Sequence, residues 1–188
     1  RDHKVMLIAD DFRTTPDPDR GWALAALAGT LSISTVKAAA IRAMAEERFD
    51  PMLFRMSRDY VGDTAETVAL MWPDVSQDVV APTVSEVIDV LSGTSRARAP
   101  AVLAELMDRL DANGRYALLK LATGGMRVGI SARLAKTAFG QAFGLSVDDV
   151  EEVWHALRPP YSELFAWGEG KTERPDPADS AFFRPFML

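Results

Sequence analysis

Apolar residues recur at helical spacing along almost the whole chain, and this periodicity constrains the fold more than any other feature. The first set stands at i, i+3, i+4 and i+7 and consists of Val5, Ile8, Ala9 and Phe12. This spacing places side chains on one face of an α-helix. It returns between residues 147 and 157. No segment shows the sustained alternation of a half-buried strand, so the sequence predicts an all-α fold.

Capping signals divide the chain into short helices. Asp17-Pro18 and Asp50-Pro51 each put an N-cap residue before a proline at the first helical position. Thr83 and Glu86 have the spacing of a capping box. We therefore expect roughly ten helices, joined by short loops and packed as a single compact domain over residues 1–167.

The two ends of the chain differ from this body. Residues 168–177 are rich in Gly, Pro and charge, which is typical of a linker, and residues 182–188 become apolar again. The chain opens on Arg1-Asp2-His3 without a Met. We expect a fragment truncated at its amino end, in which residues 168–188 form a linker and the first segment of a following domain.

The amino-acid composition limits the kinds of core and of binding site that the chain can form. The 188 residues are 48% hydrophobic, with no Cys and two His, so a real core is possible, disulfides are excluded and a zinc site is not expected. No apolar run approaches the ~20 residues of a membrane span. We expect a cytoplasmic monomer with no membrane contact and no metal site.

The charge is negative overall but unevenly spread. A formal net charge of −6 and a pI near 5.0 argue against a protein that is basic all over. Residues 96–136 nevertheless carry +5, and the remainder carries −11. The basic residues of this window are Arg96, Arg98, Arg109, Arg115, Lys120, Arg127, Arg133 and Lys136. A local basic face can hold phosphates on an acidic body, because surface charges are screened beyond roughly 8–10 Å.

A glycine-rich connection lies inside this window. Residues 123–133 read TGGMRVGISAR and join two segments with helical patterning. Glycine allows positive φ and a close backbone approach, and Ser131 can cap the helix that follows. A helix amino end with a nearby arginine suits a phosphate. The competing interpretation is a helix C-cap and a turn with no ligand.

This connection resembles the G-x-x-R-x-G-x-[SA] segment in the DNA-binding domain of bacterial ATP-dependent DNA ligases. The similarity extends over most of the chain. Its segments are residues 12–24, 59–70, 118–138, 154–161 and 183–188. The resemblance implies a helical domain that grips nicked duplex DNA by its phosphates without reading sequence, together with the ligase's own catalytic domains.

The same resemblance implies that the full enzyme uses ATP and Mg²⁺ and carries an adenylated lysine in a K-x-D-G motif. Here none of the five lysines is followed by x-Asp-Gly. We therefore expect no catalytic residue and no cofactor in this fragment, which should not seal a nick alone. Its role would belong to the repair, replication or recombination of DNA through the parent ligase.

Two sets of residues follow as candidates for DNA contact. The first set is Lys120, Gly124, Gly125, Arg127, Gly129, Ser131, Ala132, Arg133 and Lys136. For Lys120 and Lys136 a solvated helix face is the competing interpretation. The second set could hold the other side of the duplex, with a cap or a surface charge as the alternative for each member: Arg20, Lys37, Gly62 and Thr64.

Two other functions remain open from the sequence. An acidic helical scaffold for protein interactions would have the same composition and no DNA role. An independent enzyme is the weakest hypothesis, because no nucleophile–base pair, metal cluster or P-loop pattern is present.

Overall fold

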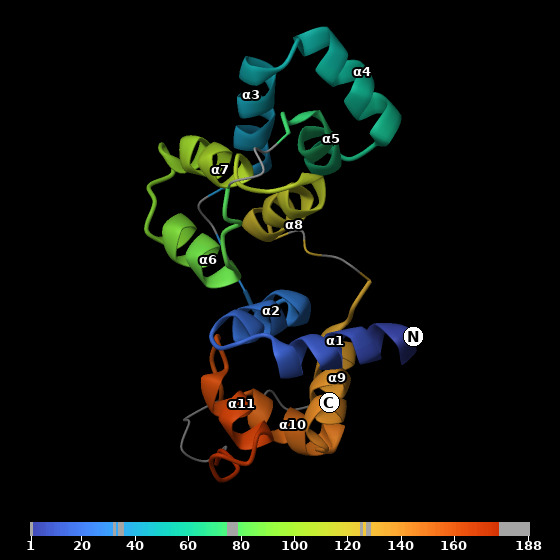
Figure 1. The fold of residues 1–188 in the computed structure, drawn as a ribbon, viewed down its shortest axis with the longest axis vertical. Coiled ribbons are helices and arrows are strands. Elements are labelled where there is room, and N and C mark those ends of the chain that lie inside the picture. Colours follow the sequence, from blue (N-terminus) through green and yellow to red (C-terminus); the bar gives the residue numbers. More distant parts are fainter. Residues whose placement is uncertain are drawn as a thin grey trace, which may run out of the picture. The chain divides into compact units, whose positions relative to one another are not determined.

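Eleven α-helices form the regular structure of the residues described by the computed structural model (Figure 1). These residues are 2–31, 33, 36–74, 79–124, 126 and 129–176, and they contain no strand. The predicted all-α class is confirmed. No helix in these ranges is long and apolar enough to cross a membrane.

The contacts divide the chain into two compact units, whereas the sequence suggested one. Unit 1 comprises residues 1–31 and 128–188, and unit 2 comprises residues 32–127. The helices of unit 1 are α1 (Asp2–Thr14), α2 (Asp19–Ala28), α9 (Ala132–Phe143), α10 (Val147–Trp154) and α11 (Ser162–Gly168). Those of unit 2 are α3 (Ala38–Arg48), α4 (Pro51–Val61), α5 (Thr64–Met71), α6 (Val84–Ser92), α7 (Ala99–Met107) and α8 (Ala112–Ala122).

Helix α9 is the centre of unit 1. Helix α1 packs along it most extensively, and α2 and α10 also contact it. The core is aromatic: the rings of Phe12 and Phe139 both lie against Phe165, with centroid distances of 5.7 and 5.1 Å and nearly perpendicular planes. Edge-to-face pairs of this kind stabilise a core beyond the area that they bury. This core fixes α9, whose amino end carries the predicted contact residues.

A close backbone approach joins α2 to the chain before α11. A Cβ on Gly21 would stand 1.6 Å from the carbonyl oxygen of Pro160, so only glycine fits there. The next residue, Tyr161, is buried and stacks on Trp154 at a centroid distance of 4.7 Å. Its hydroxyl shares a hydrogen bond of 2.8 Å with Thr30. These contacts hold Tyr161 in the left-handed region, at φ 57°, where it precedes α11.

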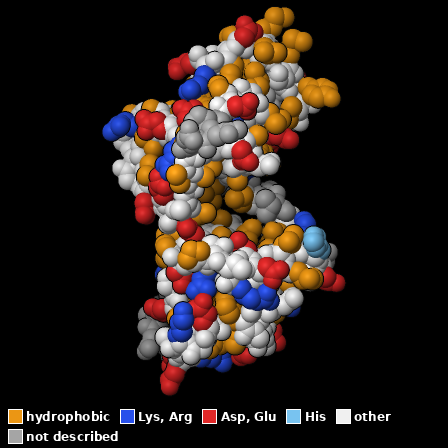
Figure 2. Space-filling model, in the orientation of Figure 1, with side chains coloured by type: hydrophobic (Ala, Val, Ile, Leu, Met, Phe, Trp, Pro, Cys, Tyr) orange, Lys and Arg blue, Asp and Glu red, His pale blue; other side chains and the backbone are white. Residues whose placement is uncertain are grey.

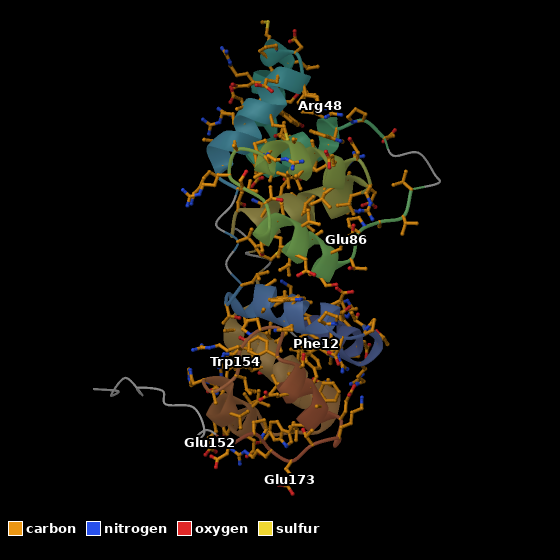
Figure 3. The ribbon with its side chains drawn as sticks, turned by 90° about the vertical axis from the view of Figure 1, so that its left-hand side faces the viewer. Phe12, Arg48, Glu86, Glu152, Trp154 and Glu173 are labelled. Atoms are coloured by element: carbon orange, nitrogen blue, oxygen red, sulfur yellow. The ribbon has the colours of Figure 1, made fainter. Side chains whose placement is uncertain are left out.

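Unit 2 is built around the pair α5 and α8, with α4 along α5 and α6 against α7. Its tryptophan, Trp72, is buried and donates its indole N–H to Asp108 at 2.7 Å. The guanidinium of Arg48 lies 4.2 Å from the centre of the same ring (Figure 3). A buried indole with its N–H satisfied and a cation on its face is a stable anchor for the ends of α3 and α5.

The helix starts test the capping predictions. Asp50 accepts hydrogen bonds from the amides of Met52 and Leu53, as the Asp-Pro device predicts. The same prediction for Asp17 is wrong. Helix α2 has Pro18 at its N-cap without a side-chain cap, because the carboxylate of Asp17 is bound to Arg20 instead.

Candidate nucleic-acid interface

The amino end of α9 is exposed and has the geometry of an anion site. Ser131 is the N-cap, and its hydroxyl accepts the amide of Leu134 at 3.2 Å. Ala132 and Arg133, the first two residues of the helix, are exposed. Within the described residues, neither of their amides donates a hydrogen bond. Two donors and the positive end of the helix dipole therefore face solvent.

Gly129 leads into this helix in a left-handed conformation, with φ 68°. It is exposed, and a Cβ at this position would meet the ammonium of Lys4 at 3.2 Å. Lys4 belongs to α1, which packs on α9. Lys4 was not among the predicted contacts, because its proximity to the loop depends on helix packing and not on spacing along the chain.

Arg133 supplies a second cation at this end of unit 1. Its side chain is exposed and makes no ion pair within the described residues. Gly125 and Arg127, two central members of the predicted set, lie outside the described residues. Gly124 is exposed at φ 69° with open space around it, and it belongs to unit 2.

Lys120 does not have the solvated position that would leave it free for DNA. Its ammonium binds the carboxylate of Asp63, the N-cap of α5. Partial burial acts to raise the pKa of Asp63, but hydrogen bonds from Lys120 and from the amides of Glu66 and Ala65 outweigh it and lower that pKa. The hydrogen bond to Asp63 in turn raises the pKa of Lys120. The pair neutralises the lysine charge inside unit 2.

The pairing also changes the interpretation of Gly62 and Thr64. Gly62 ends α4 at φ 81°, and Thr64 is the first residue of α5. The anion at this helix start is the protein's own Asp63, which leaves no vacancy there for a phosphate. Their cap interpretation is therefore the one that the structure supports. Lys37 is exposed and precedes α3 without a side-chain cap.

Lys136 is largely buried, with an exposed fraction of 9%. Its ammonium lies 4.9 Å from the centre of the Trp154 ring (Figure 3 labels Trp154). Desolvation lowers the pKa of Lys136, and the nearby Glu151 opposes this only partly. The residue holds α9 against α10 by a cation–π contact, so it is neither a solvated surface lysine nor a ready phosphate ligand.

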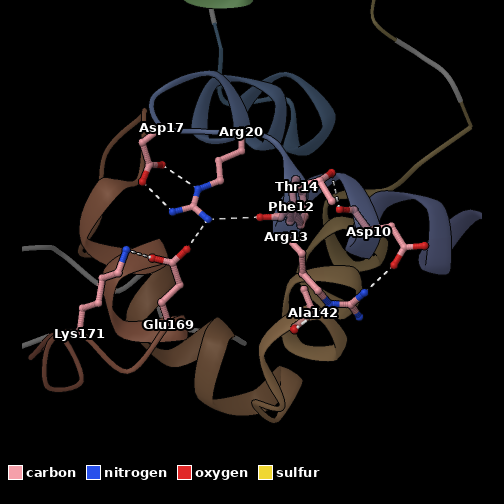
Figure 4. Close-up of polar contacts among 9 residues, drawn as sticks. All are labelled: Asp10, Phe12, Arg13, Thr14, Asp17, Arg20, Ala142, Glu169 and Lys171. Carbon is pink, nitrogen blue, oxygen red and sulfur yellow. Dashed lines mark hydrogen bonds and ion pairs between the residues drawn. The ribbon is translucent and has the colours of Figure 1, made fainter.

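Arg20 is a buried structural cation, which corrects its place in the second set of DNA contacts (Figure 4). Its Nε and Nη2 donate to the two carboxylate oxygens of Asp17 at 2.8 and 2.6 Å. Its Nη1 donates to Glu169 at 2.6 Å and to the carbonyl of Phe12 at 3.3 Å. All three guanidinium nitrogens are satisfied within unit 1, and the hydrogen bond to Asp17 is the largest influence that raises the pKa of Arg20.

The basic window of residues 96–136 is consequently not a continuous basic surface. Arg115 is buried at 2% exposure, and Arg109 is paired with Glu86. Arg96, Arg98 and Arg133 are its exposed cations without an ion pair in the described ranges. A ligand interacts mainly with the charges close to its binding site, and the amino end of α9 still carries exposed positive charge.

No metal site accompanies this surface in the described ranges, where no three His, Cys, Asp or Glu side chains gather as a metal ion would require. No protein-family model matches the chain, and no curated protein matches its sequence significantly. Local geometry and the resemblance of residues 12–24, 59–70, 118–138, 154–161 and 183–188 are therefore what indicate a function.

Proposed function

We propose that this chain is a DNA-binding domain of an ATP-dependent DNA ligase and that it binds duplex DNA through backbone phosphates without sequence preference. The observation that carries the proposal is the exposed amino end of α9. There Gly129, the amides of Ala132 and Arg133, which have no hydrogen-bond acceptor among the described residues, and the nearby Lys4 gather on one unit. A phosphate placed at these amides would be stabilised by the helix dipole and by two cations.

Sequence-independent binding follows from the kind of donor. Backbone amides and a short cap hydroxyl reach phosphate oxygens but offer no pattern that distinguishes one base from another. Contact with a few phosphates gives weak, salt-dependent affinity. Such a domain would depend on the ligase's catalytic domains to close around the nick, and it would act in the cytoplasm.

The chemistry of sealing would lie elsewhere in the parent enzyme. None of the five lysines has the K-x-D-G context, and Lys120 and Lys136 are held in internal contacts. We therefore assign no step of the reaction to this chain.

Fluorescence anisotropy with a labelled nicked duplex tests the proposal. At about 50 mM salt the chain should bind, and the logarithm of its affinity should fall linearly with the logarithm of salt, by about 0.9 for each neutralised phosphate. Arg127→Ala and Arg133→Ala should each lower the affinity equally on unrelated duplexes and make the slope shallower. Arg42→Ala, which removes an exposed charge from α3, is the matched control and should leave the affinity nearly unchanged.

The alternative function is an acidic protein-interaction scaffold, and the exposed apolar side chains of α4 favour it. A scaffold with a net charge of −6 should not bind either duplex at low salt. Absence of binding by the parent chain would refute the DNA proposal, whereas binding that Arg127→Ala and Arg133→Ala leave intact would refute only the assigned site.

A further inference from the structure

Helix α4 presents an apolar surface to solvent. Phe54 is its one fully buried side chain. Four large apolar residues are exposed: Met52 (71%), Leu53 (56%), Met56 (62%) and Tyr60 (93%). Figure 2 shows the hydrophobic side chains gathered over this helix. We call these four residues the α4 stripe.

The stripe is continuous along the helix. Met52, Met56 and Tyr60 are spaced four residues apart, so they form one ridge, and Leu53 widens it on one side. Contiguous exposed apolar patches of several hundred Å² are uncommon on monomeric proteins and mark interaction surfaces. Within the described residues nothing covers the stripe, since all four side chains are more than half exposed.

Charges border the ridge on its other side. Arg55 and Asp59 are both exposed and are also four residues apart, which puts them on a common flank of α4. Arg55 has no ion pair in the described ranges, and Asp59 has only the contact with its neighbour Arg58 at 3.4 Å. An exposed pair of that length contributes little. The flank therefore offers one positive and one negative charge to a partner.

We propose that the α4 stripe pairs with the α4 stripe of a second copy of this chain, in an antiparallel arrangement. In a two-fold interface each contact occurs twice with its partners exchanged. A two-fold axis beside Met56 brings the two Met56 side chains together and places Met52 opposite Tyr60. The same operation brings Arg55 of one copy to Asp59 of the other, and it does so at both ends of the pair.

The charge flank is what selects a second copy as the occupant. The midpoint of Arg55 and Asp59 lies one residue along the axis from Met56, so the two-fold axis leaves Arg55 about 3 Å along the helix axis from Asp59 of the second copy. Both side chains are long enough to span this offset. Ridges formed by side chains four residues apart also pack into the grooves between ridges of the same spacing on a second helix. A single helix face buries less than the about 800 Å² per partner of a standard interface, so the dimer forms at high concentration. This departs from the monomer expected from the sequence.

Sedimentation velocity tests whether the chain forms a dimer, because it reports the mass of the species in solution. The parent chain should shift from 20.6 kDa toward twice that mass between roughly 10 and roughly 500 μM, the range of a weak complex. Met56→Glu should remain monomeric throughout. Met6→Glu is the matched control, because Met6 is also a more than half-exposed methionine, on α1, and it should still dimerise. A parent chain that stays monomeric, or loss of the dimer in both variants, would overturn the proposal.

Two further variants test the antiparallel register. Arg55→Asp and Asp59→Arg should each weaken the dimer by about tenfold, and the double exchange should restore it. The chain has no cysteine, so Met56→Cys introduces a single thiol beside the two-fold axis and should form a covalent dimer on mild oxidation. Met6→Cys should not. Equal cross-linking of the two, or a double exchange that fails to recover the dimer, contradicts this register.

Discussion

Arg115 shows how a residue counted as surface charge becomes part of a core. Its side chain is 2% exposed and donates to three backbone carbonyls, those of Met107 at 3.0 Å, Trp72 at 3.0 Å and Pro73 at 2.6 Å. These carbonyls lie at or just after the ends of α7 and α5. The planar guanidinium satisfies them together and ties α8 to α5 and α7.

Removing this side chain should cost unit 2 much of its stability. Arg115→Ala would remove three hydrogen bonds to backbone carbonyls and leave a cavity behind, and we expect a loss of roughly 3–5 kcal/mol in the free energy of unfolding. Urea unfolding followed by circular dichroism measures it. Arg98→Ala, an exposed arginine at the start of α7, should change stability by less than about 0.5 kcal/mol. Similar losses in both variants would show that the carbonyl contacts are unimportant.

Lysine and arginine positions also show the limit of prediction from sequence at this scale. Nothing near Lys120 in the chain indicates that Asp63 is its partner, 57 residues away. Spacing within a helix can be read directly, but ion pairs across the fold depend on packing. The basic window was therefore overestimated as a surface, while Ser131 was identified correctly as a cap from local chemistry, and Gly129 has the positive φ that glycine was expected to allow.

At the scale of elements, an ion-pair cluster joins the start of α2 to the end of α11. Arg20 bridges Asp17 and Glu169, and Lys171 binds the second oxygen of Glu169 at 2.6 Å (Figure 4). Hydrogen bonds from Arg20 and Lys171 lower the pKa of Glu169 to about 2. Its ordinary value is 4.5, so folding favours the ionised carboxylate.

The sign of the pH effect follows from this depressed pKa. The stabilisation is complete above the unfolded value and is lost as the pH falls from about 4.5 to about 2. Glu169→Gln should lower stability at neutral pH and flatten the pH dependence in this window, as thermal unfolding at stepped pH would show. Glu173→Gln, at an exposed position (Figure 3), should follow the parent curve. A parent-like slope in Glu169→Gln would contradict the assignment.

Helix boundaries were predictable where a side chain makes the cap. Thr83 and Ser131 cap α6 and α9 through their hydroxyls, as their spacing indicates. Helix α11 was not predicted, because its N-cap residue, Tyr161, provides no capping side chain and has a left-handed backbone. Its start is held by the stacking of Tyr161 on Trp154 and by the hydroxyl contact with Thr30. Those are tertiary contacts, and they leave no local signal.

At the scale of the whole molecule, the division into two units follows contacts that no linker-like sequence marks. The chain passes between them near residues 31 and 128, and the second crossing lies inside the glycine-rich connection. The predicted DNA contacts are therefore distributed over both units, with Gly124 on unit 2 and Gly129 to Lys136 on unit 1. The amino end of α9 is the part of the site that unit 1 completes by itself.

Backbone amide NMR is the most direct test of this account. A nicked duplex titrated at about 50 mM salt should perturb the resonances of Gly129, Ala132 and Arg133 most strongly, and raising the salt should reverse the change. The amides of α3, such as that of Arg42, should not move. If Ala132 and Arg133 stay fixed while the duplex binds elsewhere, or if no resonance moves, the amino end of α9 is not a phosphate site.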